Sequence, residues 1–222
     1  MALPALDAQV PERTETATLA MGCFWRPDAL FGSINGVIST RVGYASGNTD
    51  NPSYWQLADH IESVQLEYDP AIVSYEHLLQ VFFSSHTPTR TPWKRQYASA
   101  MFYHSPDQER QAHQAKEQLE ARAGQNVFTE IGPYKDFYLA EARHQKYKLQ
   151  RQPALWVEFE EMYPDFNDRI SSTAAARANA CLYGYVSRKG LEKVIGSLGL
   201  SPAAQRVLLQ KAAAPAFISC GG

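Results

Sequence analysis

Short stretches in the first two thirds of the chain alternate between apolar and polar residues, which is the pattern of half-buried β-strands. Val64, Leu66 and Tyr68 alternate in this way with polar neighbours. Between these stretches the apolar positions recur every three or four residues, as on one face of an α-helix. The pattern predicts strands at 16–21, 37–44, 63–68, 97–103, 128–131 and 137–140, and helices at 24–31, 74–83 and 105–123.

Capping residues mark the starts of two of these helices. Ser74 precedes the second helix, where its hydroxyl can accept a hydrogen bond from an unpaired backbone N–H. The third helix begins at Ser105, with Pro106 at the first helical position and Gln108 placed for a capping box.

The pattern changes after about residue 150, where helical periodicity replaces the alternation of helices and strands. The order β-α-β-β-α-β-α-β before that point predicts an α+β domain, a two-layer ferredoxin-like-type mixed sheet with helices packed on it. We expect an N-terminal arm at 1–15, the α+β domain at 16–150 and a helical C-terminal extension at 151–222. The extension is predicted to contain helices at 172–182, 191–198 and 202–213.

Composition and charge exclude several classes of protein. The 222 residues are 45% apolar and 20% charged, with 21 Lys and Arg against 23 Asp and Glu, a formal net charge of −2. These are ordinary globular values, and they give no long-range attraction for nucleic acid or an anionic membrane. No apolar run approaches the roughly 20 residues that cross a bilayer. The acidic Asp7 and Glu12 do not fit a signal peptide. We expect a cytoplasmic monomer.

The three cysteines are too few and too scattered for a disulfide scaffold or a zinc site. Cys23 follows Gly22 at the predicted junction of a strand and a helix, where unpaired N–H groups favour a thiolate. The next two residues, Phe24 and Trp25, can form an apolar wall for a small group such as a methyl. A buried structural cysteine beside two core aromatic residues would look the same at this level.

The residues around Cys23 resemble the active-site signature of the A-type peptide methionine sulfoxide reductases. The resemblance covers about residues 16–150 and rests on many motifs in order rather than on any single one. The matching segments are Gly22-Cys23-Phe24-Trp25, the run from Gly36 to Gly47, Asn51-Pro52-Ser53-Tyr54, His60-Ile61-Glu62, Tyr68-Asp69-Pro70, Ser74 to Leu79, Gln96-Tyr97-Ala98-Ser99-Ala100 and His144-Gln145-Lys146-Tyr147.

The resemblance implies that Cys23 attacks the sulfur of methionine sulfoxide and that Phe24 and Trp25 hold its methyl group. It implies that Glu62 protonates the departing oxygen. A carboxyl in an aromatic pocket suits this role, because burial favours its protonated form. Taken alone, Glu62 would be read as a solvated surface residue.

The resemblance also assigns residues to the rest of the pocket. Tyr44 and Tyr97 would hydrogen-bond the sulfoxide oxygen, and His144 would be a hydrogen-bonded histidine near the substrate. The family commonly carries an aspartate in the loop before Tyr97 that organises the oxygen pocket. The corresponding loop here, 87–95, contains no acid, and Pro92 stands near that position. The support of the oxygen pocket is therefore the main departure from the family pattern.

Attack by Cys23 leaves a sulfenic acid, which a second thiol can convert to a disulfide for exchange with a dithiol. Cys220 lies in a Gly-rich ending that resembles the resolving segments of the family, and we expect it to be the resolving thiol. Cys181 lies in an apolar helical pattern and is the second candidate. The resemblance implies thioredoxin as the reductant, free or protein-bound S-epimer methionine sulfoxide as substrate, and no metal or other cofactor.

Two other functions remain open from the residues. A thiol acyltransferase or hydrolase would pair Cys23 with His60 or His144 and would need that histidine within hydrogen-bond reach of the sulfur. A non-catalytic module could instead recognise methionine side chains through the aromatic pocket. Its function would survive replacement of Cys23.

Overall fold

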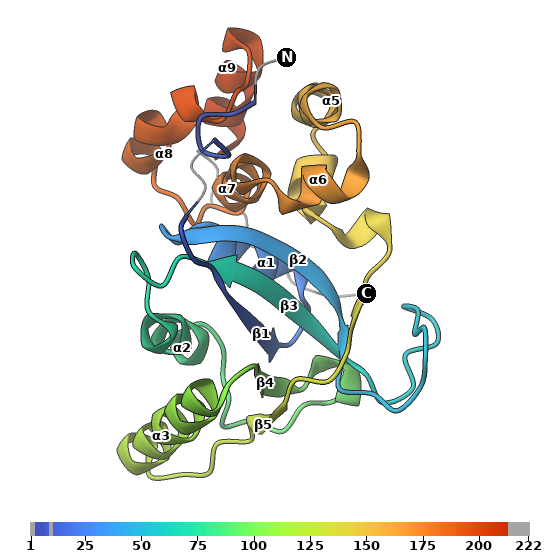
Figure 1. The fold of residues 1–222 in the computed structure, drawn as a ribbon, viewed down its shortest axis with the longest axis vertical. Helices are drawn as coiled ribbons and strands as arrows, with labels where there is room; N and C mark the ends of the chain where they lie inside the picture. Colours follow the sequence, from blue (N-terminus) through green and yellow to red (C-terminus); the bar gives the residue numbers. More distant parts are fainter. Residues whose placement is uncertain (1–2, 9–10, 213–222) are drawn as a thin grey trace.

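The computed structural model describes residues 3–8 and 11–212, which form a six-stranded mixed sheet with helices around it (Figure 1). The strand order is β5-β4-β1-β3-β2-β6, and every pair is antiparallel except β4 with β5. The strands are β1 (Glu15–Met21), β2 (Val37–Ala45), β3 (Ile61–Tyr68), β4 (Ser99–Tyr103), β5 (Glu130–Pro133) and β6 (Phe137–Leu139). The structure confirms an α+β fold with a mixed sheet.

Three helices share one apolar core with one face of the sheet. They are α1 (Trp25–Gly32), α2 (Tyr75–Ser84) and α3 (Pro106–Ala123). Their buried side chains pack against the inward-facing side chains of β1, β3 and β4. The burial of this apolar area stabilises the fold. The core contains Ala17, Leu19, Phe31, Val64, Leu66, Leu78, Leu79, Phe82, Met101 and Ala112. Ser74 and Ser105 cap α2 and α3 as the sequence predicts.

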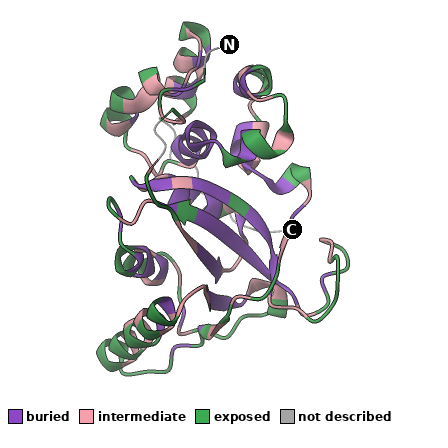
Figure 2. Cartoon of the chain, in the orientation of Figure 1, coloured by how far each residue is buried: buried purple, intermediate pink, exposed green. Residues whose placement is uncertain are grey.

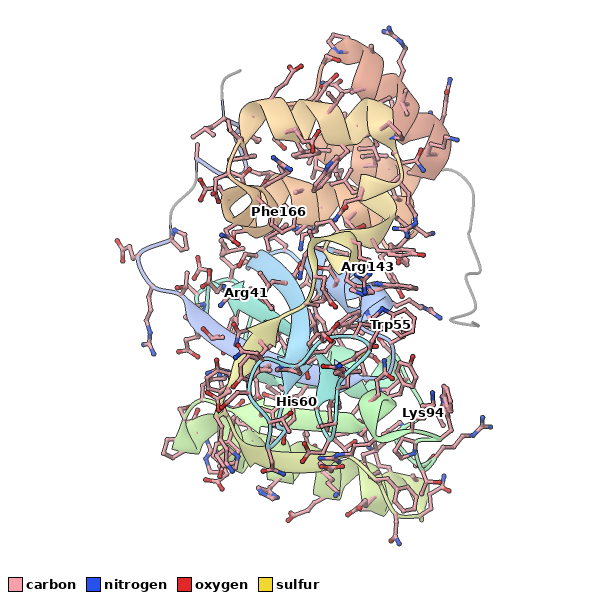
Figure 3. The ribbon with its side chains drawn as sticks, turned by 90° about the vertical axis from the view of Figure 1, so that its right-hand side faces the viewer. Arg41, Trp55, His60, Lys94, Arg143 and Phe166 are labelled. Carbon is pink, nitrogen blue, oxygen red and sulfur yellow. The ribbon has the colours of Figure 1, made fainter. Side chains whose placement is uncertain are left out.

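The last third of the described chain is helical and has its own apolar core, which includes Leu155, Phe159, Ala178, Leu198 and Leu208. Figure 3 shows these helices, with Phe166 among them, beside the sheet that carries Arg41. None of the described helices is long and apolar enough to cross a membrane. The helices are α4 (Tyr147–Gln150), α5 (Pro153–Met162), α6 (Phe166–Ser171), α7 (Thr173–Leu182), α8 (Arg188–Val194) and α9 (Pro202–Ala212).

The central helix of this group, α7, is buried along its whole length (Figure 2). It packs so closely on α1 that a Cβ added at Gly32 would lie 2.9 Å from the carbonyl oxygen of Ala176. Glycine is therefore required at this crossing of two helix backbones. The contact fixes α1, the helix that follows Cys23, against the C-terminal helices.

Several predicted boundaries are wrong, and short-range geometry explains them. The strand predicted at 97–103 begins at Ser99, because Arg95–Tyr97 forms a 3₁₀ turn. The strand predicted at 128–131 lies at Glu130–Pro133. The helix predicted at 191–198 begins earlier, where Ser187 caps α8, and continues as a separate 3₁₀ turn at Ile195–Ser197. Helices α4, α5 and α6 were not predicted.

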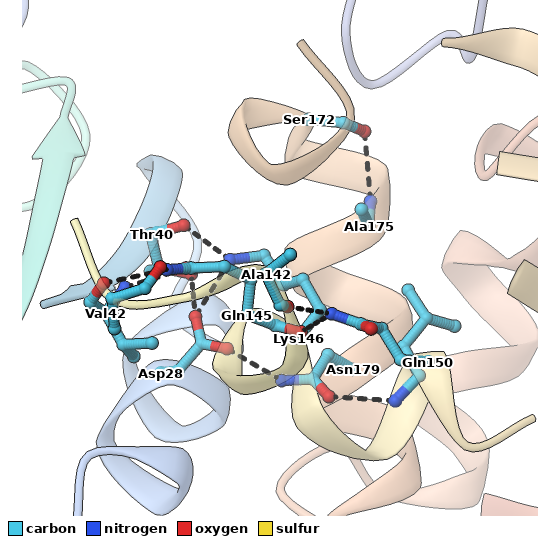
Figure 4. A network of polar contacts seen from close by, with 12 residues as sticks. Asp28, Thr40, Val42, Ala142, Gln145, Lys146, Gln150, Ser172, Ala175 and Asn179 are labelled. Atoms are coloured by element: carbon cyan, nitrogen blue, oxygen red, sulfur yellow. Dashed lines mark hydrogen bonds and ion pairs between the residues drawn. The ribbon is translucent and has the colours of Figure 1, made fainter. Parts of the chain in front are cut away.

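A buried ion pair and its hydrogen bonds join four of these elements (Figure 4). Lys146 Nζ lies 2.9 Å from Asp28 Oδ1, and both side chains are at most 1% exposed. Asp28 also accepts hydrogen bonds from Thr40 Oγ1 at 2.6 Å and from Asn179 Nδ2 at 3.1 Å. The carboxylate therefore ties α1 to β2, to the start of α4 and to α7.

We expect Lys146→Met to lower the free energy of unfolding by about 3–5 kcal/mol, because it leaves the Asp28 carboxylate buried without its cation. The measurement is equilibrium unfolding in urea with the same slope assumed for each variant. The double variant Asp28→Asn with Lys146→Met removes both charges and should lose less than Lys146→Met alone. Equal losses in the two variants would contradict this account.

Candidate active site

Cys23 lies between β1 and α1 in the turn that the sequence predicts. Gly22 adopts φ +91°, a left-handed conformation that favours glycine, and this turns the chain sharply from the strand into the helix. The cysteine side chain is half-buried and lines a pocket of about 270 Å³ with Arg26, His86 and Tyr185. The sulfur thus borders an opening on the protein surface.

Glu62 is buried beside this turn and is not a solvated surface residue. It lies on β3, is 1% exposed, and its Oε2 accepts a hydrogen bond from the backbone N–H of Phe24 at 3.1 Å. Its Oε1 accepts a hydrogen bond from Gln96 Nε2. The sheet thereby places a carboxyl group next to the residue that follows the cysteine.

The register of β2 and β3 pairs Tyr44 with Glu62, so the two side chains point to the same face of the sheet. Tyr44 is fully buried, and its hydroxyl donates to Glu141 Oε2 at 2.7 Å. Tyr97 is half-buried in the 3₁₀ turn. Its side chain hydrogen-bonds to Tyr54 and interacts electrostatically with Glu62 and Cys23. Burial is the main cause that raises the pKa of both phenols, so both remain protonated donors at neutral pH.

Glu141 is a carboxylate that the sequence analysis missed. It follows β6, and its Oε1 accepts the backbone N–H of Tyr54 at 3.0 Å while Oε2 accepts from Tyr44. Burial, the largest single effect, acts to raise the pKa of Glu141. The hydrogen bonds from Tyr44 and Tyr54 together outweigh burial and lower that pKa. The only sequence signal was an acid just before the motif that contains His144.

The two residues that follow Cys23 belong to a wall of packed aromatic rings. The Phe24 ring is buried and lies 5.9 Å from the Tyr44 ring and 5.4 Å from His144. Trp25 stacks on Tyr147 with ring centroids 3.7 Å apart. The wall therefore contains Phe24 and Trp25, and Tyr147 is a further member that the sequence analysis did not name.

His144 holds this wall in place. Its Nδ1 accepts a hydrogen bond from the indole Nε1 of Trp25 at 3.2 Å. Burial, the largest effect, lowers the pKa of His144, which agrees with a neutral ring that accepts at Nδ1. His144 is thus brought to the aromatic wall, as a residue that orients Trp25.

The structure argues against pairing Cys23 with the two histidines considered in the sequence analysis. His60 bonds through Nε2 to the carbonyl of Thr49 at 2.8 Å, and its buried Nδ1 has no hydrogen-bond partner. His144 uses Nδ1 for Trp25, and its Nε2 has no hydrogen-bond partner. Neither ring bonds to the sulfur, as a thiol acyltransferase or hydrolase would require.

The other two cysteines are Cys181 and Cys220. Cys181 is fully buried in α7, and burial raises the pKa of its thiol to about 12. Cys220 lies outside the described residues. Within the described ranges, no group of three His, Cys, Asp or Glu side chains could hold a metal ion.

The half-buried Cys23 is followed by Phe24, which bonds to a buried carboxyl through its N–H and packs among aromatic rings, and this arrangement is that of a thiol-based enzyme. The family model for peptide methionine sulfoxide reductase matches residues 15–174. The chain is 38% identical over 203 residues to a peptide methionine sulfoxide reductase of Drosophila melanogaster, covering 90% of this chain and 80% of the relative. The same enzyme of Methanococcus maripaludis is 41% identical over 147 residues, covering 62% of this chain and 94% of the relative.

Among solved structures, methionine sulfoxide reductase A of Corynebacterium diphtheriae matches with a TM-score of 0.56 and 32% identity. The match covers 69% of this chain and 84% of that one. The chain belongs to the peptide methionine sulfoxide reductase family, of the A type, and is an oxidoreductase that acts on methionine sulfoxide. The resemblance stated from the sequence is confirmed.

Proposed function

We propose that Cys23 reduces the S epimer of methionine sulfoxide, free and in proteins, and becomes a sulfenic acid. The observation that carries this proposal is the carboxyl of Glu62, buried and held by the N–H of Phe24, the residue next to Cys23. A nucleophile and an acid are thus brought to one place from positions 39 residues apart in the sequence.

In the reaction, the Cys23 sulfur attacks the sulfoxide sulfur and Glu62 donates a proton to the sulfoxide oxygen. Attack forms a bond between the two sulfurs, and the sulfoxide oxygen, which takes up one proton from Glu62 and the thiol proton of Cys23, leaves as water. A water molecule then attacks the Cys23 sulfur, the bond between the two sulfurs breaks, methionine leaves as the thioether, and Cys23 becomes S–OH. The proton that this water loses returns to Glu62, so the sulfoxide is reduced by two electrons and the thiol is oxidised by two. Protonation is needed because an unprotonated sulfoxide oxygen is a poor leaving group.

Glu141 takes over part of the role of the acid that the loop at 87–95 lacks. It accepts from the Tyr44 hydroxyl and the Tyr54 amide, and so fixes two groups beside the oxygen position. Tyr97 donates to the sulfoxide oxygen when substrate is bound. Tyr44 donates to the same oxygen only when its hydroxyl proton turns from Glu141 toward the substrate. Protonated phenols suit this task because they can donate to an oxygen that gains negative charge.

The substrate methyl packs against Phe24 and Trp25, and His144 holds Trp25 in position. A methyl on this wall, an oxygen toward Glu62 and a sulfur attacked from the side of Cys23 together fix the configuration at the sulfur. This arrangement supports specificity for the S epimer.

Cys220 resolves the sulfenic acid by forming a disulfide with Cys23 and releasing water, and thioredoxin then reduces the disulfide. The pocket beside Cys23 supports this route, because Tyr185 accepts a hydrogen bond from Arg26 at 3.2 Å and so joins α1 to the C-terminal helices. Cys181 is a poor second candidate, since its buried thiol is almost entirely protonated at neutral pH.

We expect Cys220→Ser to keep turnover with dithiothreitol and to lose most turnover with thioredoxin, while Cys181→Ser keeps both. Dithiothreitol can attack the sulfenic acid directly, whereas thioredoxin needs the disulfide. The measurement is steady-state reduction of a blocked methionine sulfoxide with each reductant. Alkylation of the folded protein at pH 8 should leave Cys181 unmodified, because its pKa is near 12. Loss of thioredoxin turnover only in Cys181→Ser would contradict the assignment.

We also propose that the strands β4-β1-β3-β2, with α1 and α2, form a ferredoxin-like core, and that residues 16–150 are the catalytic domain. The antiparallel order of these four strands supports the first statement. The relative from Methanococcus maripaludis, of which 94% is covered by 62% of this chain, supports a helical extension after about residue 150. We expect the enzyme to act as a cytoplasmic monomer.

The test of the proposed function is turnover of the separate S and R epimers of a blocked methionine sulfoxide with dithiothreitol. Reduction of the S epimer alone is the expected result. Reduction of the R epimer at a comparable rate would contradict the proposed geometry, and reduction of neither by the folded protein would contradict the activity.

A further inference from the structure

Two tryptophans stand on the surface of the part of the chain that the structure describes. Trp55 is 83% exposed and Trp93 is 74% exposed. They are the two most exposed of the large apolar side chains that the structure describes. Exposed apolar side chains that gather on one surface are typical of a binding site. Trp55 follows β2 in the loop that carries Tyr54, and Trp93 lies in the loop before Tyr97.

Ring contacts connect both tryptophans to the active site. Trp55 meets the Tyr54 ring edge-on at 5.1 Å, and Trp93 lies 5.2 Å from the Tyr97 ring. Tyr54 and Tyr97 are hydrogen-bonded to each other. The four aromatic residues therefore form a row with an exposed tryptophan at each end, and Tyr97 within the row interacts electrostatically with Glu62 and Cys23.

Cations lie along the same row. Lys94 Nζ stands 4.8 Å from the centroid of the Trp93 ring, and the Arg143 guanidinium lies 5.9 Å from that of Tyr54. Trp55, Lys94 and Arg143 are labelled on the side of the molecule that Figure 3 turns toward the viewer. A polypeptide with basic residues would be repelled here, while apolar residues would cover the exposed indole rings.

We propose that Trp55 and Trp93 bind apolar side chains on either side of the oxidised methionine in an extended, unfolded polypeptide. This inference rests on the proposed function, because the methionine sulfoxide must enter at the centre of the row. A folded protein cannot supply such a segment, since the residues on both sides of the oxidised methionine must be free to lie along the two loops. The enzyme would therefore reduce oxidised segments of apolar sequence in preference to free methionine sulfoxide.

The test compares three substrates: N-acetyl-methionine sulfoxide amide, a pentapeptide with leucine on both sides of the oxidised methionine, and the same peptide with lysine there. We expect the leucine peptide to exceed the lysine peptide in kcat/KM by about tenfold or more. Trp55→Ala and Trp93→Ala should each lower kcat/KM for the leucine peptide by about threefold to tenfold, and the double variant should remove its advantage over the N-acetyl amide.

Ile72→Ala is the matched control, because Ile72 is also an exposed apolar residue, 57% exposed, but lies beyond the far end of β3 from Glu62. It should leave the ranking of the substrates unchanged. A leucine preference that persists in the double tryptophan variant would overturn the proposal, as would an equal loss for all three substrates. A loss seen with thioredoxin but not with dithiothreitol would also overturn it, by assigning the tryptophans to the reductant.

Binding separates this proposal from the proposed function. Isothermal titration of the two peptides into Cys23→Ser measures the leucine preference without turnover. If the wild type fails to reduce any substrate, the proposed function is wrong, while tighter binding of the leucine peptide that needs both tryptophans still supports the binding surface. Equal affinity for the two peptides would overturn the binding surface even if the enzyme is active.

Discussion

Cys23→Ser is expected to abolish reduction of methionine sulfoxide, by about four orders of magnitude or more. A hydroxyl is almost fully protonated at neutral pH, and an alkoxide would not form the stable S–O product that a thiolate forms. Because Ser and Cys have similar shapes and the side chain is half-buried, the fold should be kept. The measurement is single-turnover reduction of the S epimer, which needs no recycling.

The matched control for this variant is Cys181→Ser, which replaces a buried thiol of α7 away from the pocket and should retain activity. An unchanged melting temperature in Cys23→Ser would show that the loss is chemical. Residual single turnover above about 1% of the wild-type rate would show that Cys23 is not the nucleophile. Methionine sulfoxide binding with no turnover in the wild type would favour a non-catalytic binding module instead.

Glu62→Gln is expected to lower kcat by about a hundredfold to ten-thousandfold, with a much smaller change in KM. The amide oxygen of Gln can still accept the Phe24 N–H, so the turn around Cys23 is kept, but an amide cannot donate an acidic proton to the departing oxygen. The measurement is the dependence of kcat and KM on substrate concentration, made with dithiothreitol as the reductant.

Glu67→Gln is the control on the same strand, because Glu67 lies on β3 with an exposed side chain that accepts from Ser39. It should change kcat by less than about twofold. If Glu62→Gln raises KM and leaves kcat unchanged, Glu62 binds substrate rather than protonating it. In that case Tyr44 or Tyr97 would have to supply the proton.

The elements that the sequence predicts well are those with strong local signals. Ser74 and Ser105 cap their helices, and the alternation along 63–68 lies within β3. Helix α5 was not predicted, although Pro153 stands at its first position, because its exposed Val157 interrupts the apolar and polar pattern. Tyr97 was placed in a strand because alternation cannot distinguish a strand from a short 3₁₀ turn that leads into one.

The residues of the candidate site also fall into those whose position follows from local sequence and those whose position does not. Cys23, Phe24 and Trp25 are adjacent, so their position at a strand-to-helix turn follows from local sequence. The burial of Glu62 does not follow from local sequence. A glutamate beside polar neighbours is predicted to be exposed unless its partners Phe24 and Gln96 are known. Glu141 was missed altogether, since its partner Tyr44 lies 97 residues away.

The sequence by itself determined the family, the turn that holds Cys23, and the order of strands and helices in the catalytic region. The family follows from the motifs that match in order. The turn and the order of elements depend on backbone preferences and capping over a few residues, which act in the same way in any fold. Only the tertiary structure decided that Glu62 is buried, that Glu141 accepts a hydrogen bond from Tyr44, and that Trp55 and Trp93 contact Tyr54 and Tyr97. The physical reason is that these contacts join distant segments, and the packing of the sheet and its loops selects which side chains meet.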